Sequence, residues 1–281
     1  MLPISTLLVV IQPQSPPTTL QQALGWAAVL KARLEVLLLH PIEEESEVSL
    51  AAHPWLASVL AEAACDLGQP QVVPSLESTE TIVQEAARLK ADLLLIDLQE
   101  GCTHLKSLLR QLPCPVLLVK RNQLPHCFAA AIGVGSEDSS HRQLNQAALS
   151  RLVQLADRFQ SEMRVLSALP NPAELVPLMG DVYAASYIGT DLEASYRQSL
   201  EESLRQHGLS SGLLRMAPGR PDVVLPELVQ REIVDCLLIG TVARKGFAAF
   251  WLGNTAEDVL PHIGCDVLLL RPQDDESAVA E

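Results

Sequence analysis

The chain has few of the features that mark membrane, secreted or nucleic-acid-binding proteins. Basic residues are scarce: 20 Lys and Arg stand against 34 Asp and Glu, a formal net charge of −14. The average surface field therefore repels phosphate backbones and anionic lipids, and we expect neither nucleic acid nor a membrane as a partner. The N-terminus lacks the basic region of a signal peptide, and no apolar run approaches the roughly 20 residues of a membrane span. We expect a cytoplasmic protein.

Motifs for metal binding and for common catalytic groups are also absent. The six cysteines form no C-x-x-C pair and no Cys/His cluster with zinc-like spacing, so we expect reduced thiols and assign no metal. No G-x-S-x-G elbow and no H-E-x-x-H motif occurs, and the seven histidines are scattered. No catalytic residue is assigned.

What the 281 residues do contain is a pattern of alternating strands and helices that occurs twice. Runs such as DLLLID and DCLLIG are continuously apolar, as in parallel strands that helices cover on both faces. Amphipathic stretches with apolar residues three and four apart separate these runs. The strands are expected at 7–11, 35–40, 71–73, 92–97 and 114–120, and then at 128–134, 163–169, 212–216, 235–240 and 265–271. The helices are expected near 20–34, 49–67, 80–89 and 105–112, and then near 142–159, 192–206, 223–232 and 255–262.

Each half therefore predicts an α/β domain with a mostly parallel, five-stranded sheet flanked by helices. The boundary falls in the segment RNQLP, which separates an N-terminal domain, residues 1–124, from a C-terminal domain, residues 125–272. Residues 273–281 are acidic and lack periodicity, which indicates a disordered tail.

The second half carries extra chain at 169–191, rich in Leu, Val, Met and Tyr. This segment has two interpretations. It roofs a ligand pocket or forms a subunit contact, or else it covers the sheet and core of its own domain.

The loop after DCLLIG contains the parts of an anion site. Glycines at 240, 246 and 253 permit close backbone approach, and Arg244 and Lys245 are basic. Asn254 and Thr255 open the next helix, where free N–H groups favour a phosphate. The alternative interpretation is structural, with tight turns at the glycines, an ordinary helix cap and a solvated basic pair. No G-K-[ST] occurs, so this is not a Walker A loop.

The sequence GTVARKGFAAFWLGNTAEDVL followed by CDVLLLRP, together with LLVVIQP and SEDSSHRQLNQA, resembles the universal stress protein family, and within it the tandem-domain E-type subgroup. The resemblance implies a Rossmann-like fold in each half. Nucleotide-binding members carry G-x2-G-x9-G-[ST] and an acidic residue at the end of the first strand. Here Gly240 and Gly253 match, but Ala243 replaces a glycine, Asn254 replaces Ser or Thr, and Gly133 stands at the acidic position. The first domain lacks the glycine pattern altogether.

The resemblance implies a candidate site in the C-terminal domain, with ATP or another adenine nucleotide as the candidate cofactor. Its residues are Gly133, Gly240, Thr241, Ala243, Arg244, Lys245, Gly246, Gly253, Asn254 and Thr255. The three departures weaken an ATP site without excluding one, because Ala243 adds a Cβ near the phosphates and Gly133 offers no carboxylate to a ribose.

The sequence and the resemblance together predict a non-catalytic binding or regulatory module of the stress response, with a small-molecule ligand. One alternative is an ATP-binding protein or slow ATPase that acts through residues 240–255, so any enzymatic activity is expected to be weak ATP hydrolysis at most. Another is a carrier of an apolar small molecule. We expect the two domains to form an intramolecular pseudo-dimer, with a homodimer as the alternative partner arrangement.

Overall fold

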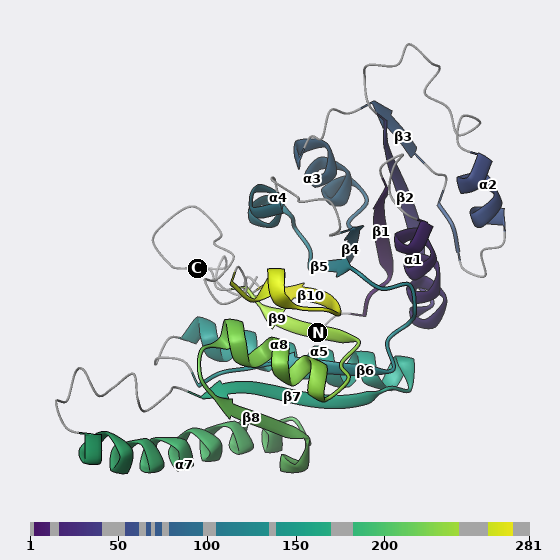
Figure 1. Cartoon of the computed structure of the whole chain (residues 1–281). Helices are drawn as coiled ribbons and strands as arrows, with labels where there is room; N and C mark the ends of the chain where they lie inside the picture. The colour runs from purple at the N-terminus through teal and green to yellow at the C-terminus, as the bar shows by residue number, and fades with distance from the viewer. Residues whose placement is uncertain are drawn as a thin grey trace, which may run out of the picture. The chain divides into compact units, whose positions relative to one another are not determined.

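The computed structural model describes residues 3–11, 17–40, 54–61, 66–68, 71–74, 79–97, 105–134, 139–169, 182–241 and 258–271. By its internal contacts the chain divides into two compact units. The first contains the described residues up to Pro125 together with Cys265–Leu269, and the second contains the other described residues from His126 onward. The expected α/β class, with a mostly parallel sheet and flanking helices, is confirmed (Figure 1).

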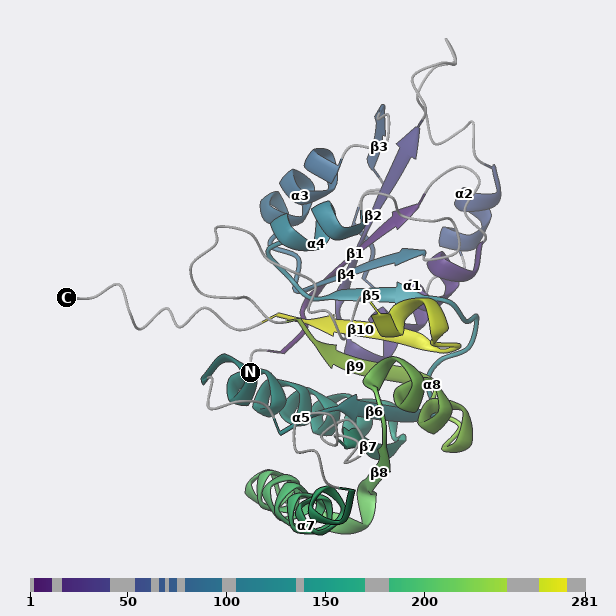
Figure 2. The same ribbon diagram turned by 60° about the vertical axis from the view of Figure 1, so that its left-hand side comes forward.

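The sheet of the first unit has the strand order β3-β2-β1-β4-β5-β10. Its first five strands in the chain are parallel, because each connection returns through a covering segment. Their bounds are β1 (Thr6–Ile11), β2 (Arg33–His40), β3 (Gln71–Pro74), β4 (Leu93–Asp97) and β5 (Val116–Val119). The helices are α1 (Pro17–Leu30), α2 (Pro54–Ala61), α3 (Thr79–Arg88) and α4 (Leu105–Gln111). Figures 1 and 2 show α3 and α4 side by side.

Strand β10 (Asp266–Leu270) comes from the C-terminal end of the chain, yet its contacts up to Leu269 lie in the first unit. It pairs with β5 in the antiparallel sense, with Leu268 opposite Leu117. Asp266 strengthens the pairing, because one carboxylate oxygen accepts hydrogen bonds from the backbone N–H groups of Lys120 (2.7 Å) and Arg121 (2.9 Å). The fifth strand expected for the second half of the chain therefore completes the sheet edge of the first unit.

The sheet of the second unit has the order β9-β6-β7-β8, and all of its pairings are parallel. The strands are β6 (Cys127–Ala131), β7 (Glu162–Leu169), β8 (Leu214–Pro218) and β9 (Cys236–Gly240). The helices are α5 (Ser139–Phe159), α7 (Val182–Gln206) and α8 (Pro221–Arg231), with short 3-10 turns η3 (Ser211–Leu213) and η4 (Leu260–His262). Figure 2 shows α5 and α8 on opposite sides of β6 and β9.

The aspartates that begin DLLLID and DCLLIG have the same structural role in the two units. Asp92 accepts hydrogen bonds from the backbone N–H groups of Ser5 (2.8 Å) and Thr6 (2.9 Å), where β1 begins. Asp235 accepts them from His126 (2.9 Å) and Cys127 (3.0 Å), where β6 begins. Each carboxylate thus satisfies two N–H groups at the amino edge of the sheet, where the strand ladder has not yet begun.

The ends of the expected strands lie within three residues of the observed ends, and the largest difference is in β6, which ends at Ala131 instead of 134. Helix α7 differs, because it begins at Val182, ten residues before the expected start near Leu192. The second half of segment 169–191 is therefore helical, whereas residues 170–181 lie outside the described part. Residues 242–257 and the acidic tail also lie outside it. Among the described segments, no helix combines the length and the apolarity that crossing a bilayer requires.

Candidate functional site

The carboxyl ends of β6 and β9 meet at one edge of the second unit's sheet. Ala131 pairs with Ile239, so the residues that follow these strands, Gly133 on one side and Gly240–Thr241 on the other, leave the sheet at the same edge. From β6 the chain continues to β7 on one side, while β9 lies on the other side, so the strand order reverses between β6 and β9. Ligands of open α/β sheets bind in the crevice outside such a reversal point.

Tyr196 of α7 occupies the neighbouring gap, between the ends of β6 and β7. Its hydroxyl accepts a hydrogen bond from the backbone N–H of Val134 (3.0 Å) and lies 3.2 Å from the carbonyl oxygen of Ala168, to which it donates. A Cβ built on Gly133 would lie 3.4 Å from this hydroxyl oxygen. The position at which an acidic residue was expected from the resemblance therefore faces a tyrosine hydroxyl.

Asn145 of α5 binds the same turn from the other side. Its side-chain amide donates to the carbonyl oxygen of Gly133 at 2.7 Å. The turn after β6 is thus fixed by two side chains, one from α5 and one from α7, and both bind its backbone. These two backbone groups, the carbonyl of Gly133 and the N–H of Val134, are therefore satisfied within the protein.

Gly240 is explained by packing against α5. A Cβ at this position would lie 3.1 Å from Cβ and 3.2 Å from Cδ2 of Leu144, which is closer than ordinary carbon contacts. Leu144 is buried and lies on the face of α5 that covers β6 and β9. The glycine allows the helix to approach the end of the strand.

Thr241 is bound within the protein. Its backbone N–H (2.8 Å) and its hydroxyl (2.9 Å) both donate to the carbonyl oxygen of Leu270. Both donors of this buried residue therefore bind the end of β10, and neither points into the crevice.

The other sequence-predicted site residues lie outside the described ranges. They are Ala243, Arg244, Lys245, Gly246, Gly253, Asn254 and Thr255. Of the predicted set, the structure brings together Gly133, Gly240 and Thr241 at the carboxyl edge of the sheet.

Two residues at this edge were not expected from the sequence. Tyr196, Leu200 and Leu204 recur every four residues and are all buried, which is the signal of a helix face against a sheet. That spacing predicts that the ring of Tyr196 is buried. It does not predict what the Tyr196 hydroxyl binds, because its partners depend on where β6 and β7 end. Asn145 lies within the stretch SEDSSHRQLNQA, but nothing in that stretch indicates that its side chain binds the backbone at Gly133.

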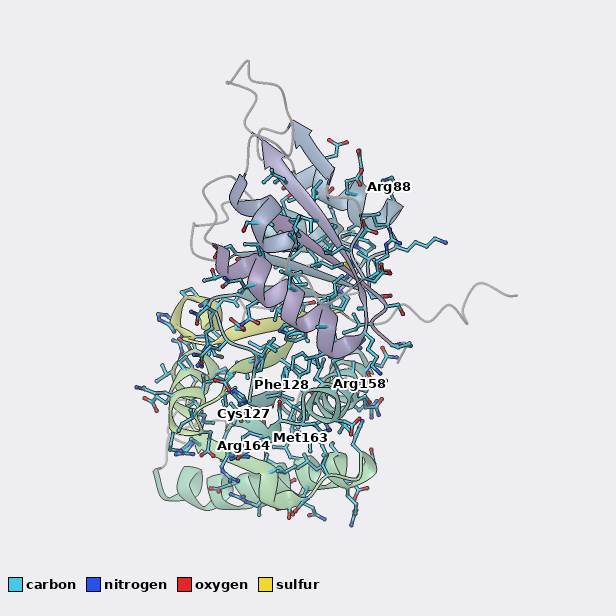
Figure 3. The ribbon with its side chains drawn as sticks, turned by 90° about the vertical axis from the view of Figure 1, so that its right-hand side faces the viewer. Arg88, Cys127, Phe128, Arg158, Met163 and Arg164 are labelled. Carbon is cyan, nitrogen blue, oxygen red and sulfur yellow. The ribbon has the colours of Figure 1, made fainter. Side chains whose placement is uncertain are left out.

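Charged side chains of the second unit gather at the opposite end of its strands. Arg215 (2.9 Å) and Arg231 (3.3 Å) form ion pairs with Glu232. Burial raises the pKa of Glu232, but hydrogen bonds from these two arginines outweigh it and leave the pKa below its usual value. Cys127 and Phe128 of β6 lie here beside Met163 and Arg164 of β7 (Figure 3). Burial raises the pKa of the Cys127 thiol to about 11, so little of it is thiolate, the nucleophilic form, near neutral pH.

The described residues show no metal centre: within those ranges no three His, Cys, Asp or Glu side chains form a group that could hold an ion. At the carboxyl edge itself, the described residues Gly133, Val134, Gly240 and Thr241 carry no ionisable side chain. The described part of the site is therefore a neutral, backbone-lined edge.

The strand order reverses between β6 and β9, glycines follow both strands, and helices cover both faces of the sheet. These features define a Rossmann-like α/β fold. Residues 132–271 match the model of the Universal stress protein family. Residues 132–271 therefore belong to the universal stress protein family.

Among characterised relatives, the chain is similar to Universal stress protein E of Escherichia coli (strain K12), with 27% identity over 175 residues. The match covers 61% of this chain and 55% of that protein, so the chain spans about half the length of the curated relatives it matches. A similar match, 24% over 168 residues, is to the Universal stress protein E homolog of Haemophilus influenzae, covering 59% of this chain and 54% of that protein.

Solved structures give matches over nearly the whole chain. A functionally unknown protein from Pseudomonas aeruginosa PAO1 superposes with a TM-score of 0.76 and 28% identity, covering 96% of this chain and 93% of that one. A universal stress protein from Archaeoglobus fulgidus has a TM-score of 0.63 at 12% identity, covering 96% of this chain and 97% of that one, and so shows the fold alone.

Proposed function

We propose that this protein is a non-catalytic binding and regulatory module of the stress response, with one ligand site at the carboxyl ends of β6 and β9. The ligand is a small molecule with a phosphate-type anionic group. Residues 240–255 form the cradle of this site, with Arg244 and Lys245 as the cationic partners and Gly253, Asn254 and Thr255 as the helix start that receives the anion.

The observation that carries the ligand site is the strand-order reversal between β6 and β9, and the described residues at this edge add no catalytic group of their own. Hydrolysis of a phosphoanhydride requires groups that orient the attacking water and neutralise developing charge. The described residues that follow β6 and β9 offer backbone groups and no ionisable side chain. Their polar groups are also used internally, by Tyr196, Asn145 and the carbonyl of Leu270.

The proposal includes a tandem organisation, with two universal-stress-protein-like domains in one chain. It is supported by the matching strand orders β3-β2-β1-β4 and β8-β7-β6-β9 and by the equivalent roles of Asp92 and Asp235. The antiparallel pairing of β5 with β10, the fifth strands of the two repeats, supports an intramolecular pseudo-dimer. A cytoplasmic location, and no nucleic acid or membrane partner, accord with the net charge of −14.

Isothermal titration of the full chain with ATP and with inorganic tripolyphosphate tests the ligand site. Gly253→Asp places a carboxylate in the proposed cradle, and we expect it to weaken binding of both ligands by at least about tenfold through charge repulsion. Gly264→Asp is the matched control, because a Cβ at Gly264 meets no atom within 4 Å. Its carboxylate should leave both affinities near the wild-type values.

The outcomes separate the candidate functions. If neither ligand binds at millimolar concentration, the proposed site is wrong. If purified protein releases phosphate from ATP well above background and Gly253→Asp abolishes this release, the protein is an ATPase. Binding without turnover supports the regulatory module.

A further inference from the structure

One apolar side chain is exposed at the amino end of the second unit's strands, the end opposite to the proposed ligand site. Ile233 lies between α8 and β9 and is 76% exposed, compared with 52% for Val223 and 40% for Val134, the other exposed large apolar residues in the described ranges. Single exposed apolar residues are common on protein surfaces and by themselves indicate no function. The backbone conformation of Ile233 makes this one unusual.

The backbone of Ile233 lies in the left-handed region, with a φ of 52°. The end of α8 requires this conformation, because the N–H of Val234 donates to the carbonyl oxygen of Val229 at 3.0 Å and so terminates the helix. A side chain branched at Cβ is disfavoured in this region. Ile233 therefore combines backbone strain with an exposed apolar surface.

Three other helix ends in the described ranges use the same conformation with a different kind of side chain. Lys31, Lys90 and Gln160 have φ values of 56°, 51° and 52°, and each lies between a helix and the following strand. All three are exposed, polar and unbranched at Cβ. Lys90 and Ile233 stand at equivalent places in the two units, two residues before the aspartates that bind the amino ends of β1 and β6. Termination of α8 therefore does not explain the isoleucine, and strain of this kind persists where a residue has a function.

Charged side chains of both signs lie near Ile233. Arg231 is 59% exposed and contacts Glu232 through Nε at 3.3 Å. Glu162, at the start of β7, is 68% exposed and binds Arg164 at 2.6 Å. Arg164, labelled in Figure 3, also lies 3.5 Å from Glu232, the neighbour of Ile233 in the chain, so both ion pairs belong to one surface. We call its three most exposed members, Ile233, Arg231 and Glu162, the amino-end patch.

A surface with an apolar side chain and both signs of charge is complementary to a second copy of itself. The net charge of −14 makes two copies of the chain repel each other on average, so contact is favoured where cationic and apolar groups are exposed together. A twofold axis beside Ile233 brings the two isoleucines together. The same axis places Arg231 of each chain near Glu162 of the other, because a symmetric interface repeats each contact in both directions.

We propose that the amino-end patch is a self-association surface, through which two copies of the chain form a symmetric dimer. The apolar part of this contact is small, so we expect a weak dimer with a dissociation constant of about 100 µM. The inference does not depend on the proposed ligand site, which lies at the other end of the strands.

Sedimentation equilibrium of the full chain, at concentrations from about 10 µM to about 1 mM, measures the association without any ligand. Ile233→Asn removes the apolar side chain and relieves the backbone strain, so the variant stays folded, and we expect its dissociation constant to rise by at least about tenfold. Val223→Asn is the matched control, because it removes an exposed apolar side chain at the other end of α8. Its dissociation constant should equal the wild-type value.

Three results would overturn the inference. The first is a wild-type chain that stays monomeric at about 1 mM. The second is a dimer that Ile233→Asn does not weaken, because the two copies then associate through a different surface. The third is an equal weakening in Val223→Asn, which would show that exposed apolar side chains act without regard to their position.

Charge exchange tests the symmetry of the contact. Arg231→Glu places acidic residues opposite each other across the axis, and Glu162→Arg places basic residues opposite each other, so each variant alone should dimerise at least about tenfold more weakly than the wild type. In an equimolar mixture, the heterodimer of the two variants has opposite charges at both contacts and should form with nearly wild-type affinity. Thermal unfolding checks that each variant is folded. A mixture that associates no better than the separate variants would contradict the pairing of Arg231 with Glu162.

Discussion

Gly240→Ala tests whether the glycine that ends β9 serves packing or ligand binding. The added Cβ would lie 3.1, 3.2 and 3.4 Å from Cβ, Cδ2 and Cγ of Leu144. Carbon atoms in contact prefer about 3.5 to 4.0 Å, so α5 or the end of β9 must shift by a few tenths of an ångström. Leu144 is 3% exposed, so the side chain has no free space to enter. Overpacking of this kind costs about 1–3 kcal/mol of unfolding free energy.

Thermal and denaturant unfolding measure this loss, with roughly 2–4 °C of melting temperature expected per kcal/mol for a domain of this size. Gly264→Ala is the control, since its Cβ enters open space and should change stability by less than about 0.5 kcal/mol. Leu144→Ala removes two of the three contacted atoms. The double variant should therefore be more stable than the sum of the two single changes predicts, by about 1 kcal/mol.

Ligand binding distinguishes the two possible roles of Gly240. If the glycine serves packing, Gly240→Ala binds tripolyphosphate with nearly wild-type affinity under conditions where it is folded. The packing explanation would be refuted if Gly240→Ala were as stable as Gly264→Ala yet had lost the ligand.

Three further predictions concern the described residues. Ile233 has a φ of 52°, in the left-handed region that branched side chains disfavour, and is 76% exposed. Ile233→Asn should therefore raise the free energy of unfolding by about 1 kcal/mol, as measured by urea titration. No gain would contradict backbone strain at this residue. Asp235→Ala leaves the two backbone N–H groups at the start of β6 without their carboxylate acceptor, and should lower the free energy of unfolding by about 2–4 kcal/mol. Asp92→Ala should have the same effect at the start of β1. A loss under about 0.5 kcal/mol in both variants would refute the stabilising role of these carboxylates. Because the pKa of Cys127 is raised to about 11, iodoacetamide at pH 8 should label this thiol only after unfolding, as peptide mass mapping would show. Rapid labelling in the native protein would contradict its burial.

The strands were predictable because local sequence and tertiary environment agree there. Runs such as DLLLID and DCLLIG need burial on both faces, and a parallel sheet between helices provides it. Helix α7 was harder to predict, because no residue between 182 and 192 marks a sharp start, and the helix begins at Val182, ten residues before the expected start.

The candidate site was only partly predictable. The sequence placed Gly133, Gly240 and Thr241 at strand ends, and the register of β6 and β9 brings those ends to one edge. Their hydrogen-bond partners could not be predicted, because Tyr196 and Leu270 lie far away in the chain and their positions depend on packing. The reason for the glycine at 240 likewise depends on how closely α5 approaches β9.

By itself, the sequence determined the α/β class, the alternation of strands and helices and the family resemblance, since these follow from short-range periodicity and from contiguous motifs. Only the tertiary structure decided that β10 pairs with β5, that Tyr196 closes the gap between β6 and β7, and that Gly240 makes room for Leu144. These contacts join residues distant in sequence, and their geometry is set by the packing of helices on the sheet, which no local pattern encodes.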